Sequence, residues 1–333
     1  MMITLIIIIL GASFVLYTIL GGADFGAGII ETFAGEKGER TISKAIAPVW
    51  EANHVWLILA VVILFTGFPT VYASLSLVLH IPLMMVLLGI IFRGTAFTFR
   101  HYDIVQDNTH RYYTVLFKAS SFITPFFLGI TLGAMILGRI TFDQSVGFYE
   151  MFVAPWLNIF CCVMGVFAVT LFGYISAVFL VGETKNDRER RRYAMFSKQL
   201  MLFTMLFGVL VFVAAGMQGH NLVKEFLQST VSIVTLIIAA ILSPVIWLFL
   251  NRKRNKTLYL RLAVGIQVTS ILVGWFYIQY PVLIQVKGGE HYTFFNTQAP
   301  EATLKQLLIA LIAGLILVIP GFIYLFKVFK VAR

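Results

Sequence analysis

Nine apolar segments of membrane-spanning length constrain the fold of this chain more than any other feature of its sequence. A helix rises ~1.5 Å per residue, so ~20 residues cross a ~30 Å hydrocarbon layer. Backbone polar groups in lipid must be satisfied within their own segment, which favours helices. We therefore predict an all-α, polytopic membrane protein with nine transmembrane helices. Their approximate ranges are 1–21, 48–67, 74–92, 119–137, 155–181, 200–217, 227–250, 262–280 and 306–326.

The charged residues support this class of fold by their scarcity. They make up 12% of the 333 residues, whereas a soluble globular domain carries about 25%. No segment between the predicted helices is long enough for a soluble domain. We therefore predict a single transmembrane domain over residues 1–333. The largest predicted loops are residues 22–47, 93–118, 139–154 and 281–305.

The basic residues predict the orientation of the helices. The net charge is +10, but nearly all of the 25 lysines and arginines fall in alternate loops and in the C-terminal tail. Positive residues accumulate on the cytoplasmic side of membranes. This places the N-terminus outside and the C-terminus in the cytoplasm, and it makes nucleic-acid binding a poor explanation of the charge. The four exceptions are Arg139, Lys224, Lys287 and Lys305.

Two acidic residues at membrane depth are the first candidates for function. Ionisable groups inside a membrane are costly and usually have a role. Asp24, in the sequence "GGADFGAG", follows the first apolar segment, and Glu51, in "APVWEANHVW", begins the second. Asp24 could instead terminate a helix, and Glu51 could simply interact with the helix dipole. Proton or cation handling is the alternative function for both.

Two histidines extend these possibilities. His54 lies three residues after Glu51, on the same face of a helix, where a carboxylate and an imidazole could relay protons. His54 and His80 lie in neighbouring antiparallel segments, each ~9 Å from opposite faces of the membrane, and are thus ~12 Å apart along its normal. A haem held between both imidazoles is therefore not feasible, although ligation by His54 alone stays open.

Two arginines lie at the inner end of the third predicted helix. Arg93 and Arg100, in "FRGTAFTFR", could extend towards phosphate groups. The alternative is that one of them pairs with Asp24 or Glu51, because an arginine and a carboxylate stabilise each other where neither is well solvated. Arg93 is the better candidate, since it lies nearer the membrane interior.

Three stretches in the first third of the chain resemble subunit II of the bacterial cytochrome bd-type quinol oxidases. They are "GGADFGAGII" (21–30), "APVWEANHVWLI" (47–58) and "FRGTAFTFR" (92–100), and they occur in the order expected for that family. The rest of the chain agrees mainly in hydropathy and in the basic loop "GETKNDRERRR" (182–192). In this family many relatives carry an acid where this chain has Gly21, so the resemblance carries over no proton entrance at that position.

The resemblance implies a place in a larger complex in the bacterial cytoplasmic membrane. Subunit I would bind quinol, two haems b and one haem d, while this chain would ligate no haem. Its expected tasks are a cytoplasmic proton route and an interface with subunit I during quinol oxidation and dioxygen reduction to water. A small single-helix subunit, a bound quinone and lipid are further expected components. The implied positions are Asp24 and Glu51 in the proton route and Trp50, Asn53, Trp56, Arg93 and Arg100 in support of the partner or the haem environment.

Two points are independent of the resemblance. Participation of His54 follows from helix geometry alone, because some relatives have Gln at its position. The alternative class of function is a secondary transporter with an ion or substrate site at Asp24, Glu51 and Arg93. That class predicts broken helices at corresponding positions of two halves, a pattern that the sequence does not show convincingly.

Overall fold

The computed structural model describes residues 2–102, 108–143, 145–184, 186–251 and 257–331. Some side chains within its helices lie outside the described set, and Glu51 is among them. These side chains are those of residues 36–41, 43–44, 47–49, 51–52, 101–102, 108–110 and 325–331.

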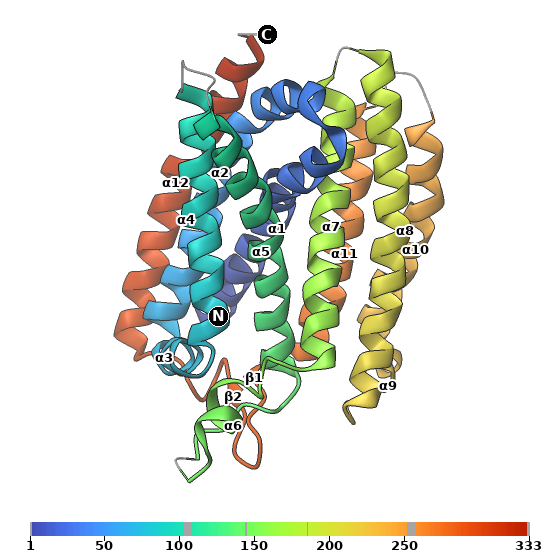
Figure 1. The fold of residues 1–333 in the computed structure, drawn as a ribbon. Helices are drawn as coiled ribbons and strands as arrows, with labels where there is room; N and C mark the ends of the chain where they lie inside the picture. The colour runs from blue at the N-terminus through green and yellow to red at the C-terminus, as the bar shows by residue number, and fades with distance from the viewer. Residues whose placement is uncertain (1, 103–107, 144, 185, 252–256, 332–333) are drawn as a thin grey trace.

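The described chain is a bundle of long helices with a small cap of short elements at one end (Figure 1). Eight helices are long and apolar enough to cross a membrane, and a bent pair formed by parts of α2 and α3 would make a ninth. The polytopic all-α prediction is thereby confirmed. The long helices are α1 (Met2–Ala34), α2 (Glu36–Gly67), α4 (His80–Tyr102), α5 (Asn108–Ile136), α7 (Ile159–Glu183), α8 (Asp187–Met217), α10 (Thr230–Leu250), α11 (Thr257–Gln279) and α12 (Glu301–Val331). The short elements are α3 (Pro69–Val78), α6 (Phe148–Phe152), α9 (Leu222–Gln228), β1 (Val282–Ile284) and β2 (Tyr292–Thr293).

The predicted loop over residues 22–47 is wrong, because most of it is helical. α1 continues to Ala34 and α2 begins at Glu36, with Gly35 between them. Gly35 has φ +68°, a left-handed conformation that glycine adopts without a Cβ penalty and that reverses the chain within one residue. Asp24 therefore lies inside α1 and does not terminate it. The predicted loop over 93–118 is shortened in the same way, since α4 reaches Tyr102 and α5 begins at Asn108.

The predicted helix over residues 74–92 is also wrong in its boundaries. The chain bends by 111° between the segments Asn53–Gly67 and Pro69–Val78, and a further long helix begins at His80. Pro69 is the first residue of α3, a position where its missing N–H removes no helical hydrogen bond. His80 consequently lies at the very start of α4 and not several residues inside a helix.

The long helices alternate in direction. The C-terminal ends of α1, α4, α7, α10 and α12 lie at one end of the bundle, opposite the end that carries α6, β1 and β2 (Figure 1). We call the first of these the basic end, because the alternate basic loops and the basic tail of the sequence follow these helix termini. Its orientation towards the cytoplasm stays a prediction of the positive-inside rule.

The opposite end is closed by a small irregular cap. β1 and β2 pair in an antiparallel ribbon, with Val282 opposite Thr293. Ile140 forms a parallel bridge to Val286, which ties the segment after α5 to this ribbon. Phe294 is buried and packs against Phe68, with 5.3 Å between ring centroids, so the cap also holds the bend between α2 and α3.

Glycines allow α1, α5 and α7 to approach closely at the centre of the bundle. A Cβ built on Gly26 of α1 would collide with the backbone carbonyl of Phe172 in α7. A Cβ on Gly165 of α7 would lie 2.6 Å from the Phe126 ring of α5. Small residues serve this purpose in membrane bundles, where lipid gives little hydrophobic drive for association and close van der Waals packing is needed.

We predict that Gly26→Ala lowers the thermal stability of the protein. The added methyl would lie 2.6 Å from the Phe172 carbonyl carbon and from Ser176 Cβ, and overpacking of this kind costs about 1–3 kcal/mol. Gly314→Ala in α12 is the matched control, because a Cβ there meets nothing within 4 Å. The midpoint of thermal unfolding in detergent should fall for the first variant only. Equal midpoints would show that α1 and α7 can separate without cost.

Candidate functional site

A row of buried ionisable side chains follows one face of α1. Tyr17, Asp24 and Glu31 are spaced by seven residues, which is close to two helical turns. Tyr17 is 5% exposed, Asp24 0% and Glu31 1%. Each step rises about 10 Å along the helix. The three groups thus span much of the bundle's depth, with Glu31 in the last turn of α1 at the basic end.

Asp24 forms a buried ion pair with Arg93 of α4. Arg93 Nη2 lies 2.5 Å from Asp24 Oδ1 and also donates to the Asp24 carbonyl oxygen. Arg93 Nη1 donates to Ser121 Oγ of α5. The guanidinium carbon lies 4.8 Å from the centroid of the Phe25 ring and 4.4 Å from that of Phe117. These contacts enclose Arg93, which is 1% exposed, and they join α1, α4 and α5. The pairing of Arg93 with Asp24 that the sequence suggested is confirmed.

A glycine makes this arrangement sterically feasible. A Cβ built on Gly28, one turn after Asp24, would collide with Ser121 Oγ. The missing side chain therefore leaves the space in which Ser121 approaches α1 and accepts from Arg93. Asn53 of α2 completes the surroundings of Asp24, because its Nδ2 donates to Asp24 Oδ2 across 3.5 Å.

Glu31 forms a second charged cluster, which the sequence interpretation missed. Arg100 Nη2 lies 3.2 Å from Glu31 Oε2, and Lys118 Nζ lies 3.9 Å from Oε1. The Arg100 guanidinium also lies 4.6 Å from the Phe117 ring centroid, so Phe117 contacts the arginines of both clusters. Glu31 was missed because it fell within a predicted loop. Its seven-residue spacing from Asp24 was the available signal, but it has meaning only if α1 continues past Asp24.

Asn53, 0% exposed, is buried between α1 and α2 in space that Gly21 provides. A Cβ built on Gly21 would lie 3.1 Å from Asn53 Oδ1 and 3.3 Å from Nδ2. An acidic side chain at position 21 would thus need Asn53 to move.

Two tryptophans of α2 lie near His54 in the sequence, and one of them contacts its ring. The Trp50 ring lies edge-on to His54 at 5.8 Å and packs against Phe97 at 5.3 Å. Trp56 is buried and its ring lies 5.8 Å from that of Phe322 in α12. His54 is half-buried and within electrostatic range of both Asp24 and Arg93. The structure therefore places His54 in the electrostatic neighbourhood of the Asp24 site, whereas its pairing with Glu51, which helix geometry predicts, stays a prediction.

Several polar atoms near this site are buried without a hydrogen-bond partner among the described residues. They are the Tyr17 hydroxyl, Trp50 Nε1, Asn53 Oδ1 and Trp56 Nε1. Buried polar groups are normally satisfied by protein or by ordered water. Glu51 lies in α2 among these residues, but its side chain is outside the described set, so its pairing with His54 stays a prediction.

His54 and His80 lie too far apart to hold one haem between them. His54 lies thirteen residues before the end of α2, which is about 20 Å along the helix. His80 begins α4 beyond that end, and its Nδ1 is 2.8 Å from the Leu77 carbonyl oxygen. Across the described part of the chain there is also no group of three or more His, Cys, Asp or Glu side chains that could hold a metal ion.

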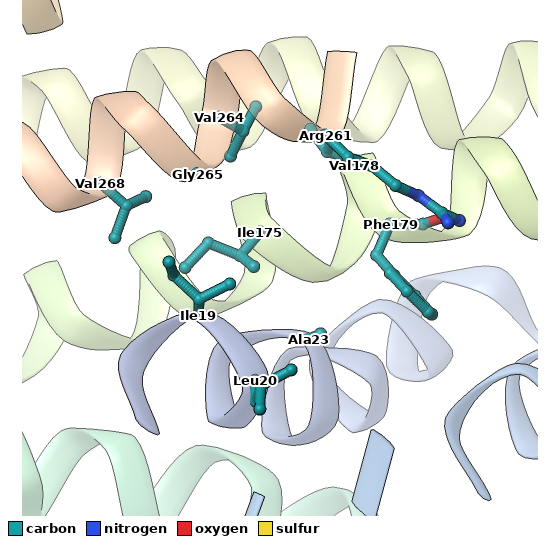
Figure 2. Close-up of a pocket in the computed structure, with 10 residues that line it drawn as sticks. All are labelled: Ile19, Leu20, Ala23, Ile175, Val178, Phe179, Arg261, Val264, Gly265 and Val268. Atoms are coloured by element: carbon teal, nitrogen blue, oxygen red, sulfur yellow. The ribbon is translucent and has the colours of Figure 1, made fainter. Parts of the chain in front are cut away.

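An apolar groove lies on the other side of α1 from the charged row. It is lined by α1, α7 and α11 and has a volume of about 180 Å³ (Figure 2). Arg261 lies at one end, where it donates to the Phe179 carbonyl oxygen and pairs with Glu183 across 2.8 Å. The remaining lining residues are Ile19, Leu20, Ala23, Ile175, Val178, Phe179, Val264, Gly265 and Val268.

A family model described as "Cytochrome bd terminal oxidase subunit II" matches residues 2–329 of the chain. The chain belongs to this family. Subunit II is therefore part of a terminal oxidase, an oxidoreductase complex that contains haem and a subunit I. Together with the apolar helices, this membership makes it a multi-pass protein of the bacterial cytoplasmic membrane. The transporter alternative is not favoured.

Curated relatives agree with this assignment. Cytochrome bd ubiquinol oxidase subunit 2 of Bacillus subtilis (strain 168) is 26% identical over 330 residues, covering 97% of this chain and 94% of the relative. A putative cytochrome bd menaquinol oxidase subunit II of the same strain is 26% identical over 337 residues, covering 94% and 91%. Cytochrome bd-I ubiquinol oxidase subunit 2 of Escherichia coli (strain K12) is 25% identical over 218 residues, covering 64% of this chain and 57% of the relative.

A solved structure shares the fold of subunit II. It is described as "The structure of bd oxidase from Geobacillus thermodenitrificans", with a TM-score of 0.77 and 23% sequence identity. The match covers 100% of this chain and 99% of that chain. The long helices of subunit II and the elements between them thus have counterparts throughout that chain.

We predict that Arg93→Met strongly destabilises subunit II, because it leaves Asp24 buried without its charge partner. Breaking one side of a buried ion pair costs about 3–5 kcal/mol. The double variant Asp24→Asn with Arg93→Met removes both charges and should recover much of the loss. The yield of folded protein and its unfolding midpoint measure this. A double variant that is less stable than Arg93→Met would show that the pair is not the reason for the arginine's effect.

Proposed function

We propose that subunit II supplies a proton route from the cytoplasm to its partner, subunit I, during quinol oxidation and reduction of dioxygen to water. The observation that carries this proposal is the buried row of ionisable groups on α1, which begins in the last turn at the basic end and continues into the bundle. Such groups are costly in a membrane interior and are expected only where they have a function.

The buried polar atoms around α2 support a continuous path for protons. Proton transfer needs donors and acceptors within hydrogen-bonding reach, either directly or through one water molecule. Tyr17, Trp50, Asn53 and Trp56 each carry a buried polar atom without a partner among the described residues. Ordered water beside these atoms would satisfy them and would link the groups of the row.

The proposal gives Asp24 and the residues of α2 different tasks. Arg93 fixes the position of Asp24, and the ion pair of the two residues sets the local electrostatic field of the route. His54 lies within that field and, with Glu51, would exchange protons. In this proposal Trp50, Asn53, Trp56 and Arg100 support the partner and the haem environment, and contacts with Phe97, Asp24, Phe322 and Glu31 hold them in position.

The two haems b and the haem d belong, in this proposal, to subunit I. The separation of His54 from His80 supports this assignment, since those two imidazoles cannot bind one iron atom. Exposed apolar side chains on α12, such as Leu317 at 76%, offer a surface for subunit I, for lipid or for a small single-helix subunit. The quinol is proposed as a class only, because the names of the relatives include both ubiquinol and menaquinol.

The apolar groove suits the tail of a lipid or a quinone. Its lining is almost wholly hydrocarbon, and Gly265 leaves open space, since a Cβ there meets nothing within 4 Å. We predict that Gly265→Leu fills the groove and lowers the amount of lipid or quinone that co-purifies with the complex, as measured by mass spectrometry. Gly314→Leu, at another open glycine, is the control. Equal amounts in both variants would contradict occupancy of the groove.

We predict that Glu51→Gln slows quinol oxidase turnover by about ten-fold or more, because glutamine cannot carry a proton and general acid–base groups contribute at least this much. The complex should still assemble with its full haem content. Asp24→Asn should also slow turnover, with a larger effect on assembly because Arg93 loses its partner. If Glu51→Gln assembles with full haem and keeps full turnover, its proton role is wrong.

A further inference from the structure

We propose that Glu31, held by Arg100 and Lys118, is the group through which protons enter subunit II from the basic end. This inference rests on the proposed function, because it names the entrance of the route. Glu31 lies outside the three sequence stretches that carry the family resemblance, which cover residues 21–30, 47–58 and 92–100.

The location of Glu31 fits an entrance. It lies three residues before the end of α1, so it is about 5 Å from the basic end along the helix axis. Its side chain is 1% exposed, whereas the Lys118 side chain that contacts it is 29% exposed. One side chain therefore separates this buried carboxylate from solvent. Asp24 lies seven residues deeper on the same face. Its partner Arg93 does not connect it to solvent, because the Arg93 side chain is only 2% exposed.

The charged groups around Glu31 come from three helices. Arg100 of α4 and Lys118 of α5 approach its two oxygens. Tyr193 of α8 is within electrostatic range, and Arg192 of α8 donates to the carbonyl oxygens of Phe33 and Ala34 at the end of α1. The cluster of Glu31, Arg100 and Lys118 therefore holds a buried carboxylate within reach of two cationic side chains at the basic end.

The cluster is connected to the Asp24 site by shared packing. The Phe117 ring contacts the guanidinium groups of both Arg93 and Arg100. Between Glu31 and Asp24 the distance along α1 is about 10 Å, which a proton would cross through intervening water. The Ser121 hydroxyl fills the space beside Gly28, midway on this face, so a polar group lies between the levels of the two carboxylates.

The packing of Gly21 is a second, independent observation in favour of Glu31. An entrance at position 21 would need an acidic side chain, but this position has no side chain and the Asn53 amide fills the adjoining space. The other described acids at the basic end are Glu183 of α7 and Asp187 and Glu189 of α8. Glu183 pairs with Arg261, and Glu189 accepts from Thr184. Of these four acids, Glu31 is the one that shares a helix face with Asp24.

The test uses the assembled oxidase complex carrying Glu31→Gln, compared with Glu31→Asp and with Glu183→Gln. Glu183 is the matched control, because it is also a carboxylate paired with an arginine at the basic end. Turnover is measured at pH 6 and pH 8, together with the unfolding midpoint and haem content. Proton uptake is followed with a pH-sensitive dye in liposomes that contain the complex.

We predict that Glu31→Gln slows turnover and proton uptake by about five-fold or more at pH 8 and by much less at pH 6. A side chain that takes up protons from solvent matters most when free protons are scarce. The slowing should therefore be larger at pH 8 than at pH 6. Glu31→Asp retains an ionisable group and should keep most of the activity, and Glu183→Gln should keep turnover at both pH values. The unfolding midpoint of Glu31→Gln should fall, because Arg100 and Lys118 lose their carboxylate, but this loss alone would slow turnover equally at pH 6 and pH 8.

Two results would overturn the inference. Equal slowing at pH 6 and pH 8 with a lowered unfolding midpoint would show that Glu31 only neutralises Arg100 and Lys118. Normal turnover of Glu31→Gln at pH 8, alongside slow turnover of Glu51→Gln, would place the entrance elsewhere and leave the proposed function intact. If neither variant were slowed, the proposed function itself would fail. Should Glu31→Gln not assemble, the double variant with Lys118→Gln, which also removes one of the two cations that contact Glu31, is measured in the same way.

Discussion

The buried ion pair between Asp24 and Arg93 is the interaction on which the centre of the protein depends. Moving each ion out of water costs several kcal/mol, and the mutual attraction offsets this only where further hydrogen bonds satisfy the remaining donors and acceptors. Arg93 donates to Ser121 and to the Asp24 backbone as well as to the carboxylate, and two aromatic rings face its guanidinium. The pair therefore fixes the relative positions of α1, α4 and α5.

The second charged cluster depends on the same arrangement. With α1, α4 and α5 in place, Arg100 and Lys118 both reach Glu31, one from each neighbouring helix. Phe117 contacts the arginines of both clusters, so a single ring on α5 is shared between two layers of charge. Close helix contact is required throughout, and glycines at positions such as 26 and 28 permit it. The proposed movement of protons along α1 would thereby depend on groups that lie within the packing of the helix and not at its surface.

Much of the fold follows from the sequence because the membrane limits the choices. Apolar length fixed the number of long helices to within one, and the alternation of basic loops agrees with the alternating helix directions (Figure 1). The errors arose where polar residues were interpreted as loops. The segment 22–47 contains Asp24 and Glu31, and each is paired inside the bundle, so the helix continues through them. Hydropathy alone does not distinguish a polar residue in water from one with a buried partner. His80 was misplaced for a related reason, because a bend of 111° after α2 shifts the start of the next long helix.

The sequence by itself determined that the protein lies in a lipid membrane and that its fold is all-α. It also showed that ionisable residues are rare near the apolar segments, which made Asp24, Glu51 and Arg93 candidates. These properties depend on composition and spacing, which are local. The tertiary structure alone decided that Arg93 takes Asp24 as its partner, that Asn53 fills the space beside Gly21 and that Glu31 is buried between two cations. Those outcomes depend on which helix faces meet. Glu31 and Arg100, for example, are 69 residues apart in the chain and come together only through the packing of α1 and α4.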